Sequence, residues 1–304
     1  MTARVDGFLN LLKPPGMSSH DVVGFARRVL HTKKVGHAGT LDPGAAGVLP
    51  LAVGQATRLI EYLEHASKSY RAELLLGVAT DSGDLSGAVT ERQALAKMPG
   101  RAAIEQVLDR FRGEITQVPP AHSAIKIGGK RAYERLRAGE AVQLPARWVT
   151  IHRLDLLAVE EASHRLLLDV DCSRGTYIRS LCRDIGSALG VPAVMSFLVR
   201  TRVGDFPLKA SLTLEELAAR GGSALKAPED CLSHLPRYDL PPGRARAFRN
   251  GLPTHDPRVG ALAALPVRVY ADGIFLGIGR VDAAHASVVP AKVIGSPDRT
   301  SPQK

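Results

Sequence analysis

Strand-like and helix-like segments are interleaved along this chain in an order that limits the folds open to it. Apolar residues alternate at period two over residues 70–78, as in a strand with one buried face. Over residues 104–111 they recur at helical spacing, and we expect Gly113 to cap that helix. Further strands are expected at 7–12, 149–159, 166–172 and 196–203, and further helices at 20–30, 56–63 and 179–189. Because the two kinds of segment do not alternate strictly, we predict an α+β fold built on a mixed sheet.

The composition of the chain changes near Leu235, where a proline-rich segment (240–243) and a helix-like stretch (244–249) begin. Short β-rich segments follow at 267–270, 274–278 and 287–289. Closely spaced strands separated by turn residues are typical of a small β-barrel. We therefore predict two domains, a catalytic domain of residues 1–235 and a small β-barrel domain of residues 236–304.

The charge balance bears on the partner of this protein. Hydrophobic residues make up 45% of the chain and charged residues 23%, which excludes an intrinsically disordered protein. Forty Lys and Arg against thirty Asp and Glu leave a net charge of +10, and an excess of this sign attracts polyanions such as RNA and DNA. On charge alone, a basic enzyme without a nucleic-acid partner is an equally open interpretation.

Several motifs of cofactor-dependent proteins are absent from the sequence. The three cysteines, Cys172, Cys182 and Cys231, have no C-x-x-C spacing and indicate neither a disulfide framework nor a zinc site. No phosphate-binding loop ends in Gly-Lys-Ser/Thr, and no Gly-x-Gly-x-x-Gly follows a strand. We expect no metal and no cofactor, so that side chains alone carry the chemistry. No signal peptide or membrane-length apolar run is present, and we expect a cytoplasmic protein with no membrane contact.

The glycine-rich loop of residues 36–47 is the strongest local signal in the chain. Four glycines in twelve residues allow the backbone to approach a ligand closely, and Asp42 precedes Pro43 within this loop. A residue before proline is driven to an extended conformation, which projects its side chain from the loop. An Asp-Pro turn that merely connects two elements is the alternative, but the glycine density and flanking His37 favour Asp42 as a catalytic carboxylate.

Two further segments carry aromatic and basic side chains together. Lys68 and Tyr70 begin the strand of residues 70–78, and such a pair suits base stacking, although a strand tyrosine more often serves packing. Residues 174–179 join a strand to a helix and contain Arg174, Tyr177 and Arg179. A helix N-terminus with solvated arginines is the alternative interpretation of this second segment.

Basic residues also cluster in three places that bracket the glycine-rich loop in the sequence. The clusters are Arg27, Arg28, Lys33 and Lys34; then Lys126, Lys130, Arg131, Arg135, Arg137 and Arg147; and finally Arg237, Arg244, Arg246 and Arg249. Each cluster alone is compatible with an ordinary solvated face. Together they indicate a surface that follows a phosphate backbone.

At these residues the sequence resembles the TruB pseudouridine synthases. The matching motifs are Leu12-Lys-Pro-Pro-Gly-Met-Ser-Ser19, the loop from Gly36 to Leu49, Tyr70-Arg-Ala with Thr80-Asp-Ser-Gly-Asp84, Gln117-Val-Pro-Pro120 with Ser123-Ala-Ile-Lys126, Ser173 to Arg179, and Leu198-Val-Arg200. The resemblance extends from Phe8 to about Phe206. The C-terminal segment resembles the PUA-type RNA-binding domain more weakly.

The resemblance implies a role for each matching residue. Asp42 would be the nucleophile and Arg179 its ion-pair partner, which we expect to bring the pKa of Asp42 below its ordinary value. Tyr70 would stack on the target uracil and take part in proton transfer. The substrate-binding residues implied by the family are His37 at the flipped nucleotide, Tyr177 and Leu198 lining the base pocket, and Lys13 supporting the loop. His122 departs from the family, which usually carries an aromatic residue or methionine there.

The activity implied by the resemblance is isomerisation of uridine 55 in the T-loop of tRNA. This reaction needs no redox partner, metal or diffusible cofactor. An RNA-binding protein that helps tRNA to fold, without turnover, is the alternative. We expect neither a guide RNA nor an obligate protein partner, because the chain begins only a few residues before the first motif and lacks a long basic tail. Nothing in the sequence indicates an obligate oligomer, and we expect a monomer.

Overall fold

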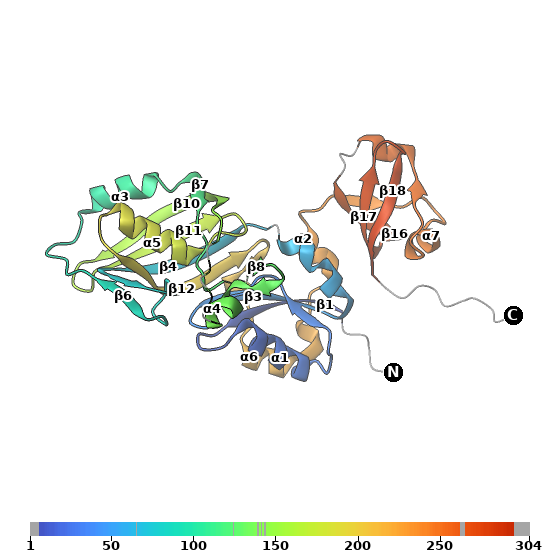
Figure 1. The fold of residues 1–304 in the computed structure, drawn as a ribbon. Helices are drawn as coiled ribbons and strands as arrows, with labels where there is room; N and C mark the ends of the chain where they lie inside the picture. Colours follow the sequence, from blue (N-terminus) through green and yellow to red (C-terminus); the bar gives the residue numbers. More distant parts are fainter. Residues whose placement is uncertain are drawn as a thin grey trace.

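A mixed sheet of nine strands organises the first two thirds of the chain in the computed structural model (Figure 1). The structure describes residues 6–64, 66–123, 125–138, 140, 142, 144–261 and 265–294. The central path of the sheet runs β1-β3-β12-β4-β11-β10-β7, while β2 pairs with β3 and β13 with β12. These strands are β1 (Gly7–Lys13), β2 (Val35–His37), β3 (Ala46–Val53), β4 (Lys68–Leu76), β7 (Gly113–Gln117), β10 (Arg147–Glu160), β11 (Arg165–Cys172), β12 (Ala193–Val203) and β13 (Phe206–Pro207).

The sheet is mixed because one of its pairings is parallel. Strand β12 runs parallel to β3, with Val199 opposite Ala46 and Arg200 opposite Gly47, whereas the other pairs are antiparallel. Two segments about 150 residues apart in sequence therefore lie side by side at the point where the glycine-rich loop ends. The predicted α+β fold with a mixed sheet is confirmed.

Two helices cover one face of the sheet, α3 (Arg101–Asp109) and α5 (Ile178–Ala188) (Figure 1). The alternating residues of β4, β10, β11 and β12 point their apolar side chains at these helices and form the main core. Ile104 and Leu108 of α3 and Ile185 of α5 are fully buried in it. Burial of a side chain of this kind contributes about 1.5–3 kcal/mol, so this core anchors the start of α5, where Arg179 lies.

A second helical layer, α1 (Ser19–Val29) and α6 (Leu214–Arg220), packs against β1 and β3. Helix α1 begins with the capping box seen in the sequence, in which the Ser18 hydroxyl and the Asp21 carboxylate each accept a hydrogen bond from the other residue's backbone N–H. Helix α6 begins with a second capping box, made by Thr213 and Glu216. Between β3 and β4 lie the 3-10 helix η1 (Gly54–Leu59) and the short helix α2 (Ile60–Glu64).

Smaller elements complete the N-terminal unit. They are the hairpins β5 (Val78–Thr80) with β6 (Val89–Arg92) and β8 (Lys126–Ile127) with β9 (Lys130–Arg131), the helix α4 (Ala132–Arg137), and the 3-10 helices η2 (Leu208–Ala210), η3 (Gly221–Ala224) and η4 (Pro228–Leu232). The side chains of Lys126, Lys130, Arg131 and Arg137, which belong to the middle basic cluster, lie outside what the structure describes.

The C-terminal unit is a curled, half-barrel sheet of five strands in the order β14-β16-β17-β18-β15. Its elements are β14 (Arg237–Asp239), α7 (Ala245–Arg249), β15 (Thr254–His255), η5 (Pro257–Ala261), β16 (Pro266–Ala271), β17 (Ile274–Asp282) and β18 (Ser287–Val293). Phe248 of α7 is fully buried and fills the concave side of the sheet together with Val267, Val269 and Val288.

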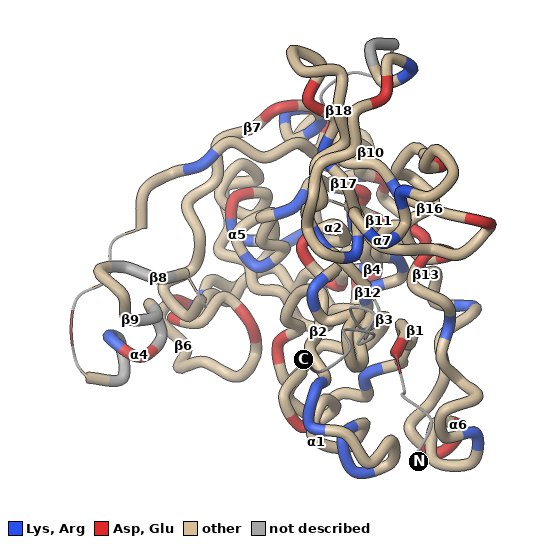
Figure 2. The backbone as a smooth tube through the Cα atoms, turned by 90° about the vertical axis from the view of Figure 1, so that its right-hand side faces the viewer, with Lys and Arg blue, Asp and Glu red and all other residues tan. Residues whose placement is uncertain are grey.

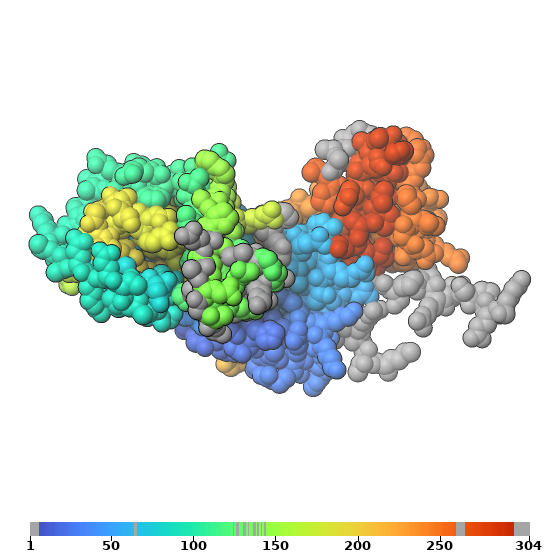
Figure 3. All heavy atoms as spheres, viewed as in Figure 1, coloured from blue at the N-terminus to red at the C-terminus, as the bar shows by residue number. Residues whose placement is uncertain are grey.

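The two units are in contact through the α2 region (Figure 3). Arg58 donates a hydrogen bond of 2.7 Å to the Val293 carbonyl, and Lys292 forms an ion pair of 2.7 Å with Glu61. Tyr270, Phe275 and Ile278 extend the apolar cluster that includes Phe8 and Phe206 of the N-terminal unit. The helices of the described residues include none that is long and apolar enough to span a membrane.

Two sequence-based expectations of local structure differ from the structure. Helix α3 ends at Asp109 with Arg110 as its cap, and Gly113 instead opens β7 at a φ of +82°. The helix expected over residues 56–63 is helical only in part, since its first turns form the 3-10 helix η1. In both cases the apolar spacing indicated a helical segment correctly, but it did not indicate where α3 ends or that the first turns of the other segment are 3-10 helix.

Candidate active site

The glycine-rich loop connects β2 to β3 and presents Asp42 at the edge of the main core. Two glycines in it adopt positive φ, +100° at Gly39 and +114° at Gly47. At Gly47 a Cβ would lie 2.3 Å from the Arg200 carbonyl oxygen of the parallel strand β12, so only glycine permits this pairing. The buried Ser19 hydroxyl fixes the backbone before Asp42, because it accepts a hydrogen bond from Leu41 N–H (2.9 Å) and donates one to Leu41 O (3.1 Å).

Asp42 and Arg179 form an ion pair with two contacts. The Arg179 Nε lies 3.0 Å from Asp42 Oδ2, and its Nη2 donates to Oδ1 at 3.4 Å. Arg179 is buried, with 6% of its side chain exposed, whereas 36% of the Asp42 side chain is exposed. The guanidinium also donates to the Ser82 and His122 carbonyls at 2.8 and 2.9 Å. The arginine is therefore held rigidly from three sides, and the carboxylate that it holds remains accessible.

The electrostatic surroundings of Asp42 differ from the expectation drawn from its arginine partner. Burial raises the pKa of the Asp42 carboxyl above its ordinary value, and the positive charges of Arg179, Lys13 and Arg200 oppose this effect without overcoming it. The prediction of a pKa below the ordinary value of an aspartate is wrong: the charge of Arg179 lowers the pKa of Asp42, but desolvation of the carboxyl raises it by more. A carboxylate that is less stabilised than in water is a stronger base and nucleophile.

Tyr70 lies on β4, directly opposite Arg200 on β12, and only 8% of it is exposed. Burial raises its pKa to about 12, although the adjacent Arg200 guanidinium favours the phenolate. Tyr70 therefore carries its proton at neutral pH. Leu198, two residues before Arg200, is buried in the apolar cluster that includes Tyr70 and Leu41.

Lys13 at the end of β1 is fully buried beneath the loop. Its ammonium donates to the carbonyl oxygens of Pro14 (2.9 Å), Met17 (2.6 Å) and Pro43 (3.1 Å). Burial lowers the pKa of Lys13 to about 8, and the negative charge of Asp42 opposes that lowering. The lysine thus holds the loop immediately after Asp42.

His37 and Tyr177 are two further residues that the family resemblance assigns to substrate binding. His37 ends β2, and its buried Nδ1 has no hydrogen-bond partner within the part of the chain that the structure describes. Burial lowers the pKa of His37, so the ring is neutral at neutral pH. Tyr177 is the N-cap of α5, where its N–H donates to Gln117 Oε1 at 2.8 Å, and the Arg147 guanidinium lies 5.8 Å from its ring centre.

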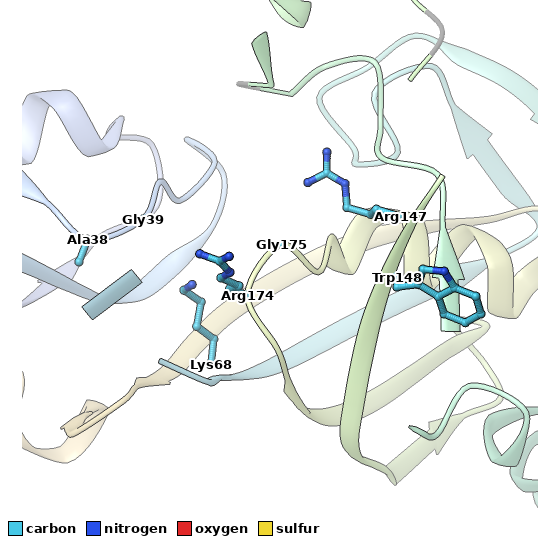
Figure 4. A pocket seen from close by; sticks show the side chains of 7 residues that line it. All are labelled: Ala38, Gly39, Lys68, Arg147, Trp148, Arg174 and Gly175. Atoms are coloured by element: carbon cyan, nitrogen blue, oxygen red, sulfur yellow. The ribbon is translucent and has the colours of Figure 1, made fainter. Parts of the chain in front are cut away.

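A basic pocket of about 470 Å³ opens between the loop and the start of α5 (Figure 4). Its lining residues are Ala38, Gly39, Lys68, Arg147, Trp148, Arg174 and Gly175. Figure 4 shows the Lys68 and Arg174 side chains side by side and facing the Ala38–Gly39 segment, with Arg147 reaching toward the same space from β10. Three cations around one opening are suited to a phosphate.

Two residues that sequence reasoning left without a role also belong to the site. Asp84 lies 3.9 Å from Arg179, and the fully buried Arg200 contacts the loop from below. Arg200 and Leu198 are two positions apart on β12, so their side chains point to the same, buried face of the sheet. A charged residue at such a position is unusual, and this pattern in the sequence could have indicated that Arg200 has a role in the site. Within the described residues, no group of three or more His, Cys, Asp or Glu side chains is placed to hold a metal ion.

Comparison with known proteins adds an independent observation to this geometry. Residues 27–178 match the family model described as "TruB family pseudouridylate synthase (N terminal domain)", and residues 179–233 match the model of the "tRNA pseudouridylate synthase B C-terminal domain". The chain belongs to the TruB family. The boundary between the two models falls at Arg179, inside one sheet and one core, so both models describe parts of the same N-terminal unit.

Curated TruB relatives match over most of their length. The chain is 48% identical over 278 residues to tRNA pseudouridine synthase B of Heliobacterium mobile, covering 91% of this chain and 90% of the relative. It is 52% identical over 246 residues to that of Symbiobacterium thermophilum, covering 81% of each chain. Among solved structures, a chain of a Cbf5-Nop10-Gar1 complex matches with a TM-score of 0.73 at 28% identity, covering 96% of this chain and 86% of the other.

Proposed function

We propose that this chain is a tRNA pseudouridine synthase that isomerises uridine 55 in the T-loop, with Asp42 as the nucleophile. The observation that carries the proposal is the Asp42–Arg179 ion pair, in which a rigidly held arginine presents an accessible carboxylate beside a basic pocket. Membership of the TruB family and relatives named tRNA pseudouridine synthase B support the same reaction and substrate.

The reaction is an isomerisation whose atoms balance without a co-reactant. The C1′–N1 bond of the target uridine breaks, the uracil turns, and a C1′–C5 bond forms. One proton leaves C5, and N1 carries a proton in the product. The Asp42 carboxylate either attacks C1′ or assists elimination to a glycal, and both routes require it to be ionised and close to the ribose. We assign to Tyr70, which is protonated at neutral pH, stacking on the uracil and proton exchange with it.

The target base must leave its stack to reach Asp42. Extruding a base costs a few kcal/mol, and stacking on an aromatic ring returns about 1–3 kcal/mol. Tyr70 and Tyr177 offer such rings, and Leu198 supplies an apolar wall. His37 precedes Ala38, which lines the pocket, and we assign to His37 a contact with the extruded nucleotide. Lys68, Arg147 and Arg174 would hold the adjoining phosphates.

The domain division near residue 235 and the identity of the C-terminal unit belong to this proposal. We assign residues 236–304 to a PUA-like RNA-binding domain, supported by its curled five-stranded sheet and by the exposed Arg244 and Arg246 beside α7. The similar solved structures include a chain of an archaeal box H/ACA sRNP Nop10-Cbf5 complex and a chain of an H/ACA RNP bound to a substrate RNA. For this chain we propose that neither a guide RNA nor a protein partner is needed and that the monomer is active.

The test uses the purified full chain and an unmodified tRNA transcript labelled with tritium at C5 of uridine. Release of one tritium per transcript, with no other RNA or protein present, is expected, together with no release from a U55→C transcript. Binding of the transcript without tritium release would contradict the proposal and favour a tRNA-folding helper or a partner-dependent enzyme. Release that persists from the U55→C transcript would contradict the assigned position.

A further inference from the structure

Arg200 is a buried arginine whose charge is met by backbone carbonyls. Only 1% of it is exposed, and its guanidinium donates to the carbonyl oxygens of Val48 (2.8 Å), Gly39 (3.0 Å) and Thr40 (3.3 Å). Among the described residues, none of the ion pairs involves Arg200. Burial of a guanidinium is costly unless its N–H groups are satisfied, so these three carbonyls account for its tolerance in the core.

The three carbonyls lie on both sides of Asp42 in the chain. Gly39 and Thr40 precede it, whereas Val48 follows it in β3. One side chain therefore joins the two ends of the glycine-rich loop. The arrangement depends on the parallel pairing of Arg200 with Gly47, which brings the β12 backbone so close that a Cβ at Gly47 would meet the Arg200 nitrogen and oxygen at 2.6 and 2.3 Å.

The same guanidinium also faces the second reactive side chain. Arg200 lies opposite Tyr70 in the antiparallel pairing of β12 with β4, and the two side chains interact within the buried layer. Arg200 thus touches both the loop that carries Asp42 and the phenol beside it. Arg200 makes both contacts while it is buried from solvent. In this it differs from Lys68, Arg147 and Arg174, which line the basic pocket.

We propose that Arg200 is the positioning residue of the active site: it closes the Asp42 loop at both ends and fixes the Tyr70 hydroxyl relative to Asp42. This inference rests on the proposed isomerase function. Without the guanidinium, three loop carbonyls lose their donor in a buried setting, and the loop relaxes in the region of Asp42. A displacement of about 1 Å in a catalytic group can cost about 100-fold in rate.

Arg200 also contributes to the charge around Asp42. The charged groups that face Asp42 are Arg179 from α5, Lys13 from β1, Arg200 from β12 and Asp84 from the turn between β5 and β6, with the Tyr70 phenol from β4 beside them. Removing one of the three positive charges leaves Asp42 less stabilised as an anion. The acidic limb of a kcat–pH profile is therefore expected at higher pH in a variant that lacks the Arg200 charge.

The test compares Arg200→Lys and Arg200→Gln with wild type in the tritium-release assay. The Lys variant keeps the positive charge but loses the planar guanidinium that donates to three carbonyls at once. Its kcat should fall about 10- to 100-fold, while its KM for tRNA stays within about twofold of wild type. The Gln variant should lose more activity, and the acidic limb of its kcat profile should move to higher pH, a change that a merely structural role would not produce. Arg202→Gln is the matched control on the same strand. Within the described residues, the polar contacts of the Arg202 side chain are with Ser67, Gly204 and Asp171, so this variant should keep the wild-type kcat and pH profile.

The outcomes separate this inference from the function on which it rests. An inactive wild-type protein would remove the proposed function, whereas an active wild type and a Lys variant of equal kcat would overturn the role of Arg200 alone. If the Gln variant does not fold, the Lys variant decides by its kcat. A Lys variant that fails to fold would also overturn the proposal, because a residue required by the whole fold is not a positioning residue of one loop.

Discussion

Two aspartate–arginine pairs in this molecule are built in opposite ways. In the active site, Arg179 is buried and Asp42 is open, with 6% and 36% of their side chains exposed. In the C-terminal unit, Asp256 is buried and Arg258 is open, with 4% and 65% exposed. Asp256 accepts hydrogen bonds from the Tyr238 hydroxyl and from the side chain and backbone N–H of Arg258.

The pKa shifts of the two carboxyls have opposite signs for that reason. The hydrogen bonds from Arg258, with the help of Tyr238, hold the pKa of Asp256 below its ordinary value. Asp42 is only partly exposed, and the desolvation of its buried part raises its pKa despite the ion pair with Arg179. A carboxylate whose acceptor sites are filled stabilises a fold and does little else. A carboxylate that remains partly exposed is available for chemistry, at some cost to the stability of the fold.

The largest expected effect is the loss of activity on removal of Arg179, the arginine of the active-site pair. Arg179→Ala should reduce kcat for tritium release by about 1,000-fold or more, because it removes the group that orients Asp42, while the Kd for tRNA stays within about threefold. Arg71→Gln breaks the exposed Arg71–Asp169 pair on the sheet and serves as a control with wild-type kcat. Substantial activity in the Arg179 variant would refute its assigned pairing with Asp42.

The second prediction concerns stability in the C-terminal unit. Asp256→Asn should lower the free energy of unfolding by about 1–3 kcal/mol, because Arg258 and Tyr238 lose a charged acceptor. Since the pKa of folded Asp256 lies below that of the unfolded chain, its contribution is present above about pH 4 and is lost as the pH falls further. Thermal unfolding at pH 7 and pH 3 measures this, and the difference between wild type and variant should shrink at pH 3. An equal difference at both pH values would contradict the assignment.

Much of the fold is readable from local sequence, since β11 alternates over its whole length, β4 and β10 alternate over part of theirs, and α1 carries its capping box at Ser18 and Asp21. The end of α3 was missed because Gly113 has the conformation of a helix cap but is used to start β7. Asp42, Tyr70 and Arg179 were selected through motifs, and the structure brings Asp42 and Arg179 together in an ion pair.

Two properties of the site cannot be derived from local sequence alone. The inward position of Arg200 on its strand is a local signal, but its contacts with the glycine-rich loop depend on a parallel pairing between strands about 150 residues apart, which neither strand's sequence specifies. The direction of the Asp42 pKa shift depends on how much protein surrounds the loop, a consequence of tertiary packing. Proximity to an arginine could be inferred from the motif, but the competing desolvation could not.

The third prediction concerns the basic pocket. Arg174→Gln should weaken tRNA binding severalfold at low salt and reduce the slope of log Kd against log salt concentration by about one, as expected when one phosphate contact is lost. Its kcat at saturating tRNA should change little, in contrast to Arg179→Ala, although the two residues are five positions apart. Filter binding across a series of potassium chloride concentrations measures the slope. Binding by wild type that does not respond to salt would contradict an RNA-phosphate role for this pocket.

The smallest effect concerns the stability cost of the open carboxylate. Because the pKa of Asp42 is raised in the folded protein, its ionised form opposes folding above that pKa, and the effect disappears as the pH falls through it. Asp42→Asn should therefore unfold at the same or a slightly higher temperature than wild type at pH 7, with a gain of up to about 1 kcal/mol. A clear loss of stability would place Asp42 with Asp256 as a structural carboxylate.

The same variant gives the most direct test of the central claim, that Asp42 is the nucleophile. Wild type and Asp42→Asn are compared in single-turnover tritium release from the unmodified transcript, with tRNA binding measured in parallel. The account predicts stoichiometric release by wild type, none by the variant, and similar Kd values. Release by a folded Asp42→Asn protein at a rate near that of wild type would contradict it.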